Sequence, residues 1–177
     1  MIDGEDKLIH DAVKGEASAF GSLYDHYQPK IYRFVMIKVS QREEAEDLTH
    51  QVFLHAFEHI GRYEDVGFPF SSWLYRIARN QIIDHYRTKR VHLPIDDMDE
   101  NRFAADPGHE AALDAAFTLE RVQSAIRRLK PEYQDVLIMR FIEELSIKET
   151  AHALEKTEGA VKLMQHRAMK QLKSLIA

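Results

Sequence analysis

The sequence predicts an all-α fold made of two small helical domains joined by an acidic, flexible linker. Gly and Pro are few, at 7 and 5 among 177 residues, and no stretch alternates apolar and polar residues for long enough to form a strand. Apolar side chains instead recur at steps of three and four. This periodicity is lost over residues 93–117, where prolines and a glycine accompany a dense acidic run. We therefore place the domains at 1–92 and 118–177.

Apolar spacing predicts the helices of the N-terminal domain. The first covers Phe20 to Val35, with a break or kink at Pro29. The second begins at Ser40, which is expected to form an N-terminal capping box with Glu43. The third runs from Ser71 or Ser72 to Thr88, after a loop that its Gly and Pro residues indicate.

The C-terminal domain is expected to hold helices at 119–129, 131–141 and 146–154, and a last helix that Thr157 caps. Pro131 suits the first position of its helix. Ser146 and Glu149 have the spacing of a second capping box.

The last two of these helices have the spacing of a helix-turn-helix motif. Ala151 occupies the position where the two helices cross closely, which requires a small side chain. A buried stripe on the last helix is expected to comprise Val161, Met164, Ala168, Leu172 and Leu175. The cations that remain on the outer face suit the major groove of DNA, although a plain bundle with a solvated charged face has the same pattern.

The net charge of −5, with an isoelectric point near 6.1, would by itself argue against nucleic acid as a partner. The charge is unevenly placed, however: residues 1–61 and 93–117 carry −5 and −6, and residues 62–92 and 118–177 carry +3 each. Charges act within about a Debye length, ~8 Å at physiological salt. The two positive segments are therefore candidates for binding nucleic acid.

Composition excludes several classes of protein. With no cysteine, the chain has no disulfide, no thiolate nucleophile and no Cys-ligated zinc. No window approaches the ~18 uninterrupted apolar residues of a membrane span. The acidic start, Met1 to Asp6, lacks the apolar segment of a signal peptide. We expect a cytoplasmic protein with no cofactor and no membrane contact of its own.

The helix that follows Ser72 combines a basic face with nearby aromatic residues. Arg76, Asn80 and Arg87 lie close together at steps of four and seven. Aromatic residues precede and accompany them, at Tyr63, Phe68, Phe70, Tyr75 and Tyr86. Such a surface suits single-stranded nucleic acid, because cations neutralise phosphates while a loop encloses an unstacked base. Most of these aromatic residues could equally belong to the core, and Trp73 is expected there because it borders the apolar stripe.

Five segments occur in a characteristic order and spacing. They are 45–53, 70–80 and 84–87, followed by 129–132 and 146–172. Together they resemble regions 2 and 4 of the extracytoplasmic-function, or group four, sigma factors of bacterial RNA polymerase. The resemblance covers nearly the whole chain from about Phe20. It implies an alternative sigma factor, not an enzyme, that binds core polymerase, directs it to specific promoters and assists promoter opening.

The resemblance also implies three sets of binding residues. Core polymerase is expected to bind Glu46, Asp47 and Gln51. The minus-ten promoter element is expected to contact Arg62, Tyr63, Phe68, Arg76, Arg79, Asn80 and Arg87. The minus-35 element is expected to contact Thr157, Lys162, Leu163, His166, Arg167 and Lys170. The partners implied are core RNA polymerase, promoter DNA and an anti-sigma factor, and the free chain is expected to be a monomer.

Three positions depart from the family pattern: Glu155, and Leu163 with Met164, which replace the more polar residues common early in the recognition helix. Glu155 stands in the turn of the helix-turn-helix, where the family usually has Gly, and a non-Gly residue there must tolerate a left-handed backbone. Leu163 is expected to face outward on the last helix, where it could contact a thymine methyl group or an inhibitor.

Three other functions compete with this hypothesis. His55 and His59 have the i, i+4 spacing of a metal-binding pair, but no carboxylate accompanies them at a diagnostic spacing. A regulator with a sensory N-terminal domain and a helix-turn-helix would bind duplex DNA without polymerase. A sigma-like decoy would bind an anti-sigma factor, but such decoys usually carry a receiver domain, for which the chain has no room.

Overall fold

The computed structural model describes residues 4–92 and 113–176, and all of its regular structure in those ranges is helical. The N-terminal domain comprises α1 (Glu5–Val13), α2 (Ala17–Val39), α3 (Arg42–His59), a 3₁₀ turn η1 (Ile60–Arg62) and α4 (Phe70–His92). The C-terminal domain comprises α5 (Leu113–Arg127), α6 (Pro131–Leu137) with a π-helical continuation η2 (Ile138–Ile142), α7 (Ile147–Leu154) and α8 (Glu158–Ile176). The predicted all-α class and the two helical domains are confirmed.

The N-terminal domain is a bundle of α2, α3 and α4, with α1 covering one end of α2. Its core contains fully buried side chains from the three long helices, among them Phe34, Val52 and Leu74. Phe70, which the sequence left open between core and surface, is buried. Trp73 is half-buried and packs edge-on against Tyr63, so it borders the core and does not lie within it as expected.

Two predictions about α2 and α3 are wrong. The break predicted as one possibility at Pro29 does not occur: α2 is continuous through Pro29, which is exposed, so that the carbonyl group left without a partner can bond water. Ser40 does not begin α3; it ends α2 in a left-handed conformation, with φ 65°, and donates its N–H to Met36. Gln41 instead precedes α3 and makes no side-chain cap. Helix α1 was not predicted at all, and its Glu5 carboxylate accepts a hydrogen bond from Tyr27.

The C-terminal domain follows its local sequence signals closely. Pro131 begins α6, as predicted. The Ser146 hydroxyl accepts the N–H of Glu149 at 3.1 Å and the Glu149 carboxylate accepts the N–H of Ser146 at 2.6 Å, which confirms the capping box. Thr157 Oγ1 accepts the N–H of Ala160 at 3.2 Å at the start of α8.

The start of α5 differs from the prediction. Helix α5 begins at Leu113, not at Leu119, so residues 113–117 of the predicted linker are helical. The remaining part of that linker, 93–112, lies outside the described residues.

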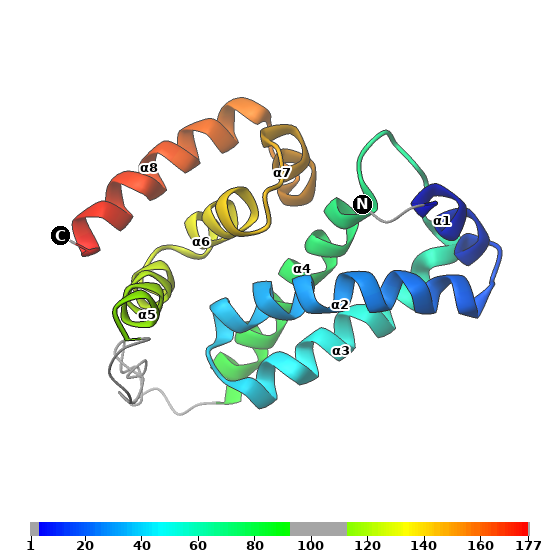
Figure 1. The fold of residues 1–177 in the computed structure, drawn as a ribbon, viewed down its shortest axis with the longest axis horizontal. Helices are drawn as coiled ribbons and strands as arrows, with labels where there is room; N and C mark the ends of the chain where they lie inside the picture. The colour runs from blue at the N-terminus through cyan, green and yellow to red at the C-terminus, as the bar shows by residue number, and fades with distance from the viewer. Residues whose placement is uncertain (1–3, 93–112, 177) are drawn as a thin grey trace.

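The two domains lie against each other. Helix α7 packs on α4, and α5 reaches α2, so that the C-terminal helices extend along one side of the N-terminal bundle (Figure 1). Small polar side chains are buried where α4 meets α7: Ser72 and Thr150 are both fully inaccessible to solvent. This contact brings the helix-turn-helix motif next to the basic helix of the N-terminal domain.

We predict that Ser146→Ala destabilises the C-terminal domain by about 1 kcal/mol, because the helix α7 loses a cap that satisfies a backbone N–H. Urea unfolding followed by circular dichroism measures the change. Ser174→Ala is the matched control, since the exposed Ser174 hydroxyl donates only to the Gln171 carbonyl near the end of α8. Equal midpoints for the two variants would show that the cap contributes nothing.

Candidate nucleic-acid interface

The three residues predicted to bind polymerase lie together on the exposed side of α3. Glu46, Asp47 and Gln51 are all open to solvent, and Glu46 makes an i, i+4 surface ion pair with Arg42 at 2.7 Å. The same helix exposes two large apolar side chains further along, Leu54 and Phe57. The sequence analysis did not single them out, although apolar residues on the polar side of an amphipathic helix are a visible signal.

The residues predicted to contact the minus-35 element lie along one exposed face of α8 and at its start. Thr157, Lys162, Leu163, His166, Arg167 and Lys170 are all exposed. Leu163 is 49% exposed, which confirms its predicted outward direction. Val161, Ala168 and Leu172 are buried on the opposite side, and Met164 and Leu175 pack beside them, as the predicted stripe requires.

The turn before α8 holds Glu155 at φ 53°, the left-handed conformation that the sequence required of this non-Gly residue. Its N–H donates to the end of α7, which closes the turn. The Glu155 carboxylate lies 3.5 Å from the guanidinium of Arg76 on α4. The departure from Gly therefore supplies a charged contact to the other domain.

Some of the predicted minus-ten residues have exposed side chains, whereas others already contact neighbouring side chains. Arg62, Asn80 and Arg87 are exposed, and the one ion pair that Arg87 makes within the described ranges is with Asp84 on its own helix, at 3.1 Å. Tyr63 is half-buried against Phe70, and burial, followed by the nearby Asp65 carboxylate, raises the pKa of Tyr63 to about 12.

Phe68 lies in the loop before α4 and faces the C-terminal domain. Its ring stacks on that of His152 in α7, with 3.9 Å between the ring centroids, and the ammonium group of Lys148 lies 5.2 Å from the Phe68 centroid. Burial, and then the charge of Arg76, lower the pKa of His152 below its usual value, which favours the neutral ring. The aromatic residue expected to contact DNA thus contacts the helix-turn-helix.

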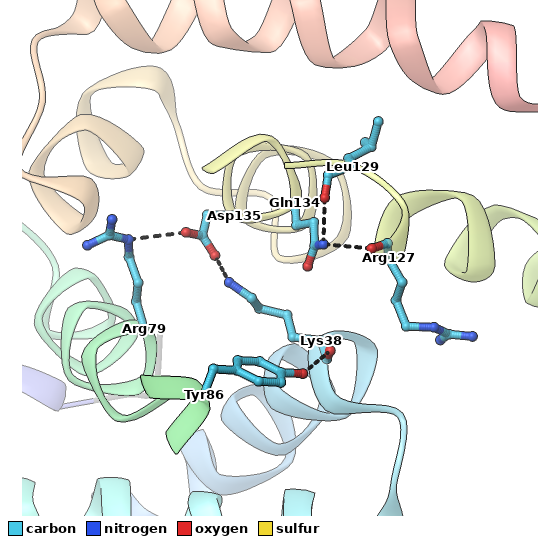
Figure 2. Close-up of polar contacts among 7 residues, drawn as sticks. All are labelled: Lys38, Arg79, Tyr86, Arg127, Leu129, Gln134 and Asp135. Atoms are coloured by element: carbon cyan, nitrogen blue, oxygen red, sulfur yellow. Dashed lines mark hydrogen bonds and ion pairs between the residues drawn. The ribbon is translucent and has the colours of Figure 1, made fainter. Parts of the chain in front are cut away.

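A buried carboxylate joins the two domains. Asp135 on α6 is 1% exposed, and its two oxygens accept from Lys38 of α2 and from Arg79 of α4, the latter at 3.1 Å. Lys38 is 6% exposed. Figure 2 shows both cations reaching the carboxylate from the N-terminal domain. We call Lys38, Arg79 and Asp135 the Asp135 network.

Neighbouring groups hold the Asp135 network in place. The Tyr86 hydroxyl donates to the Lys38 carbonyl at 3.0 Å, which joins α4 to the end of α2 (Figure 2). The Gln134 amide donates to the carbonyls of Arg127 and Leu129, at 3.0 and 2.9 Å, and so fixes α6 against the end of α5. These bonds help to fix the positions of the helices that carry the three charged groups.

A second charged contact lies at the far end of α6. Arg33 of α2 donates two hydrogen bonds to the Glu143 carboxylate, at 2.7 and 2.8 Å, and the Tyr75 hydroxyl of α4 donates a third, at 2.7 Å. The bond to Glu143 raises the pKa of Arg33, and burial, followed by the Glu143 charge, raises that of Tyr75. The sequence analysis missed Lys38, Asp135 and Glu143, although Lys38 is a single charge inside an apolar run.

The histidine pair considered as a metal site has another arrangement. The rings of His55 and His59 stack with 4.2 Å between their centroids, and His59 Nδ1 lies 2.9 Å from the His55 carbonyl oxygen. Across the described ranges, no group of three or more His, Asp or Glu side chains is placed to hold a metal ion. In the same ranges, no helix is both long and apolar enough to cross a bilayer.

Comparison with known proteins matches both domains. Residues 23–91 match the model of sigma-70 region 2, and residues 119–172 match that of sigma-70 region 4. The chain is 37% identical over 173 residues to the ECF RNA polymerase sigma factor BldN of Streptomyces coelicolor, covering 96% of this chain and 65% of BldN. It is 31% identical over 183 residues to the ECF RNA polymerase sigma factor SigW of Bacillus subtilis, covering 94% of each.

The fold is also that of a solved sigma factor. The chain superposes on RpoE of Bartonella quintana, crystallised with the anti-sigma factor NepR, with a TM-score of 0.71 and 22% identity, over 89% of this chain and 96% of RpoE. The matches to both sigma regions, in the order and positions that the two helical domains occupy, show that the chain belongs to the ECF sigma factors, a family of non-enzymatic proteins.

Proposed function

We propose that the chain binds bacterial core RNA polymerase in the cytoplasm, directs it to specific promoters and assists their opening. One observation carries the proposal: a cationic helix face stands on each domain, along α4 and along α8, whereas the net charge of the whole chain is negative. Two separate cationic faces on one chain suit a promoter with two separated elements. Membership of the ECF sigma factors supports the same conclusion.

Polymerase binding is assigned to Glu46, Asp47 and Gln51. All three are exposed on one helix, and a carboxylate that is free of strong partners remains available for a basic surface. The exposed Leu54 and Phe57 extend this surface with apolar area, which suits a protein partner more than it suits DNA.

Minus-ten recognition is assigned to the loop before α4 and to the α4 residues Arg76, Arg79, Asn80 and Arg87. Asn80 is exposed and has both a donor and an acceptor for a base edge. Tyr63 and Phe68 supply aromatic rings beside these polar groups, and such rings stack on an unpaired base.

Minus-35 recognition is assigned to α8. Lys162, Arg167 and Lys170 supply cations for phosphates and for the acceptors of guanine, whereas Leu163 suits a thymine methyl group. Thr157 at the start of the helix is placed for a phosphate contact, since a helix N-terminus favours anions. The segment 93–117 is proposed to connect the two promoter-binding domains.

An anti-sigma factor is the proposed inhibitor. The support is the solved RpoE complex with NepR, whose sigma factor has the same fold as this chain. A monomer that is free of the inhibitor would then be the form that assembles with polymerase.

In vitro transcription with purified core polymerase tests the function. Added chain is expected to produce promoter-specific transcripts from a genomic promoter library that core polymerase alone does not produce. If transcripts from every promoter in the library match those of core polymerase alone, the chain is not a functional sigma factor.

We predict that Asp47→Ala weakens the binding of core polymerase about five-fold, because the variant loses an exposed charge at the proposed contact. Affinity is measured by the fluorescence anisotropy of the labelled chain. Asp25→Ala is the control, since Asp25 is an equally exposed acid on α2 outside the proposed surface. If both variants lost the same affinity for core polymerase, the effect would come from net charge alone. Asp47 would then not belong to the proposed contact.

We predict that Asn80→Ala impairs promoter opening while leaving the minus-35 contact in place, because Asn80 lies on α4 and the minus-35 residues lie on α8. Permanganate reactivity of the minus-ten thymines is expected to fall about ten-fold at saturating holoenzyme, the scale of one lost base contact. Footprinting of the minus-35 element is the internal control. Unchanged thymine reactivity would contradict the role given to Asn80.

A further inference from the structure

Helix α1 precedes the segment that matches sigma-70 region 2, which begins at residue 23, and that match therefore assigns it no role. The helix packs on α2 and on η1, beside residues 63–69, which lead into α4 (Figure 1). We call residues 63–69 the minus-ten loop, because they include the proposed minus-ten residues Tyr63 and Phe68. Helix α1 is thus placed to act on a surface that it does not itself form.

The minus-ten loop has little regular structure of its own. Residues 63–69 form neither helix nor strand. At the tip of the loop, Gly67 has φ 78° and donates its N–H to the Asp65 carboxylate at 2.9 Å, while the side chain of Val66 is exposed. A segment with few buried apolar contacts opens at a low cost in free energy unless neighbouring elements hold it.

A buried hydrogen bond joins α1 to the core beneath this loop. The Glu5 side chain is buried, and its carboxylate accepts from the hydroxyl group of Tyr27 on α2, which is 3% exposed. The Tyr27 ring packs against that of Phe70, with 5.7 Å between the centroids. Phe70 packs in turn against Tyr63 and Trp73, at 5.3 Å each, and we call these three the aromatic cluster. A continuous series of contacts thus leads from Glu5 to the first residue of the loop.

The remainder of α1 borders the other end of the same loop. Ile9 and Val13 are partly buried against the core. They line one hollow together with Phe68 and Pro69, the last two residues of the loop. Helix α1 therefore borders the minus-ten loop at both of its ends.

Helix α1 depends on these contacts for its own structure. A helix of nine residues is marginal in water, and Gly4 before it supplies no side-chain cap. Loss of the bond between Glu5 and Tyr27 would leave a buried polar group unpaired, which costs more than the net gain from one hydrogen bond. The docking of α1 is therefore sensitive to this single bond.

We propose that α1 positions the minus-ten loop and that Glu5 is a positioning residue, whose bond to Tyr27 fixes the aromatic cluster from which Tyr63 meets an unstacked base. The consequence for the promoter rests on the minus-ten role proposed above. The positioning of the loop rests only on contacts within the N-terminal domain.

The single tryptophan of the chain reports on the loop without any label, because Trp73 packs against Tyr63. In Glu5→Ala the hydroxyl group of Tyr27 loses its acceptor, so α1 should detach and leave the aromatic cluster open to solvent. We expect acrylamide quenching of the Trp73 fluorescence to increase about two-fold, as for a local opening around a half-buried ring.

Two further variants separate this bond from charge and helix propensity. Asp6→Ala removes an exposed acid from the same first turn and should leave the quenching unchanged. Glu5→Gln keeps an oxygen that can accept from Tyr27, so its quenching should also match that of the unchanged chain. The proposal is overturned if Glu5→Ala is quenched no more than the unchanged chain, or if Asp6→Ala or Glu5→Gln is quenched as strongly as Glu5→Ala.

A double variant keeps the test decisive if Glu5→Ala unfolds. Glu5→Met combined with Tyr27→Phe replaces both partners of the buried bond with apolar side chains of similar size, which costs less than leaving one partner unpaired. Quenching of the double variant is expected to be weaker than that of either single variant. A double variant quenched as strongly as the single variants would show that the two residues do not act as a pair, and the proposal would fail.

Promoter opening tests the consequence for the proposed function. At saturating holoenzyme, permanganate reactivity of the minus-ten thymines is expected to fall about five-fold in Glu5→Ala, less than for one lost base contact, and to return in Glu5→Gln. The minus-35 footprint should not change, because α8 belongs to the other domain.

The outcomes of this experiment distinguish the two proposals. Promoter opening by Glu5→Ala that equals that of the unchanged chain would overturn the positioning role of Glu5 and leave the proposed function intact. Failure of the unchanged chain to open any promoter would instead overturn the proposed function, and the fluorescence quenching would still decide whether α1 positions the loop.

Discussion

The buried carboxylate of Asp135 is the contact on which the arrangement of the two domains depends. It is reached from α2 by Lys38 and from α4 by Arg79, so that one side chain of the C-terminal domain joins two helices of the N-terminal bundle (Figure 2). Neither cation has another carboxylate partner among the described ion pairs. Moving α6 away would leave these charges to water, and the contacts of Arg33, Arg76 and Phe68 would separate with them.

The same surface would then have two alternative partners. In the free chain the basic face of α4 pairs with carboxylates, and at a promoter it would pair with phosphates.

The parts of the fold that depend on local signals could be predicted from sequence. The capping box at Ser146, the Pro131 start of α6 and the buried stripe of α8 follow from contacts within a few residues of each other. The prediction that Ser40 begins α3 was wrong, because Ser suits an N-cap and also accepts the left-handed conformation that ends α2. Asp135 and Lys38 lie 97 positions apart, and no periodicity within either helix joins them.

Nitrogen-15 relaxation of the free chain tests the central claim most directly, because it reports how each domain tumbles. If the Asp135 network holds the domains together, backbone amides in α2–α4 and in α6–α8 will give one common rotational correlation time, suited to a particle of about 20.6 kDa. Two different and shorter correlation times, one for each domain, would show that the domains move independently and would contradict the joining of the domains through Asp135.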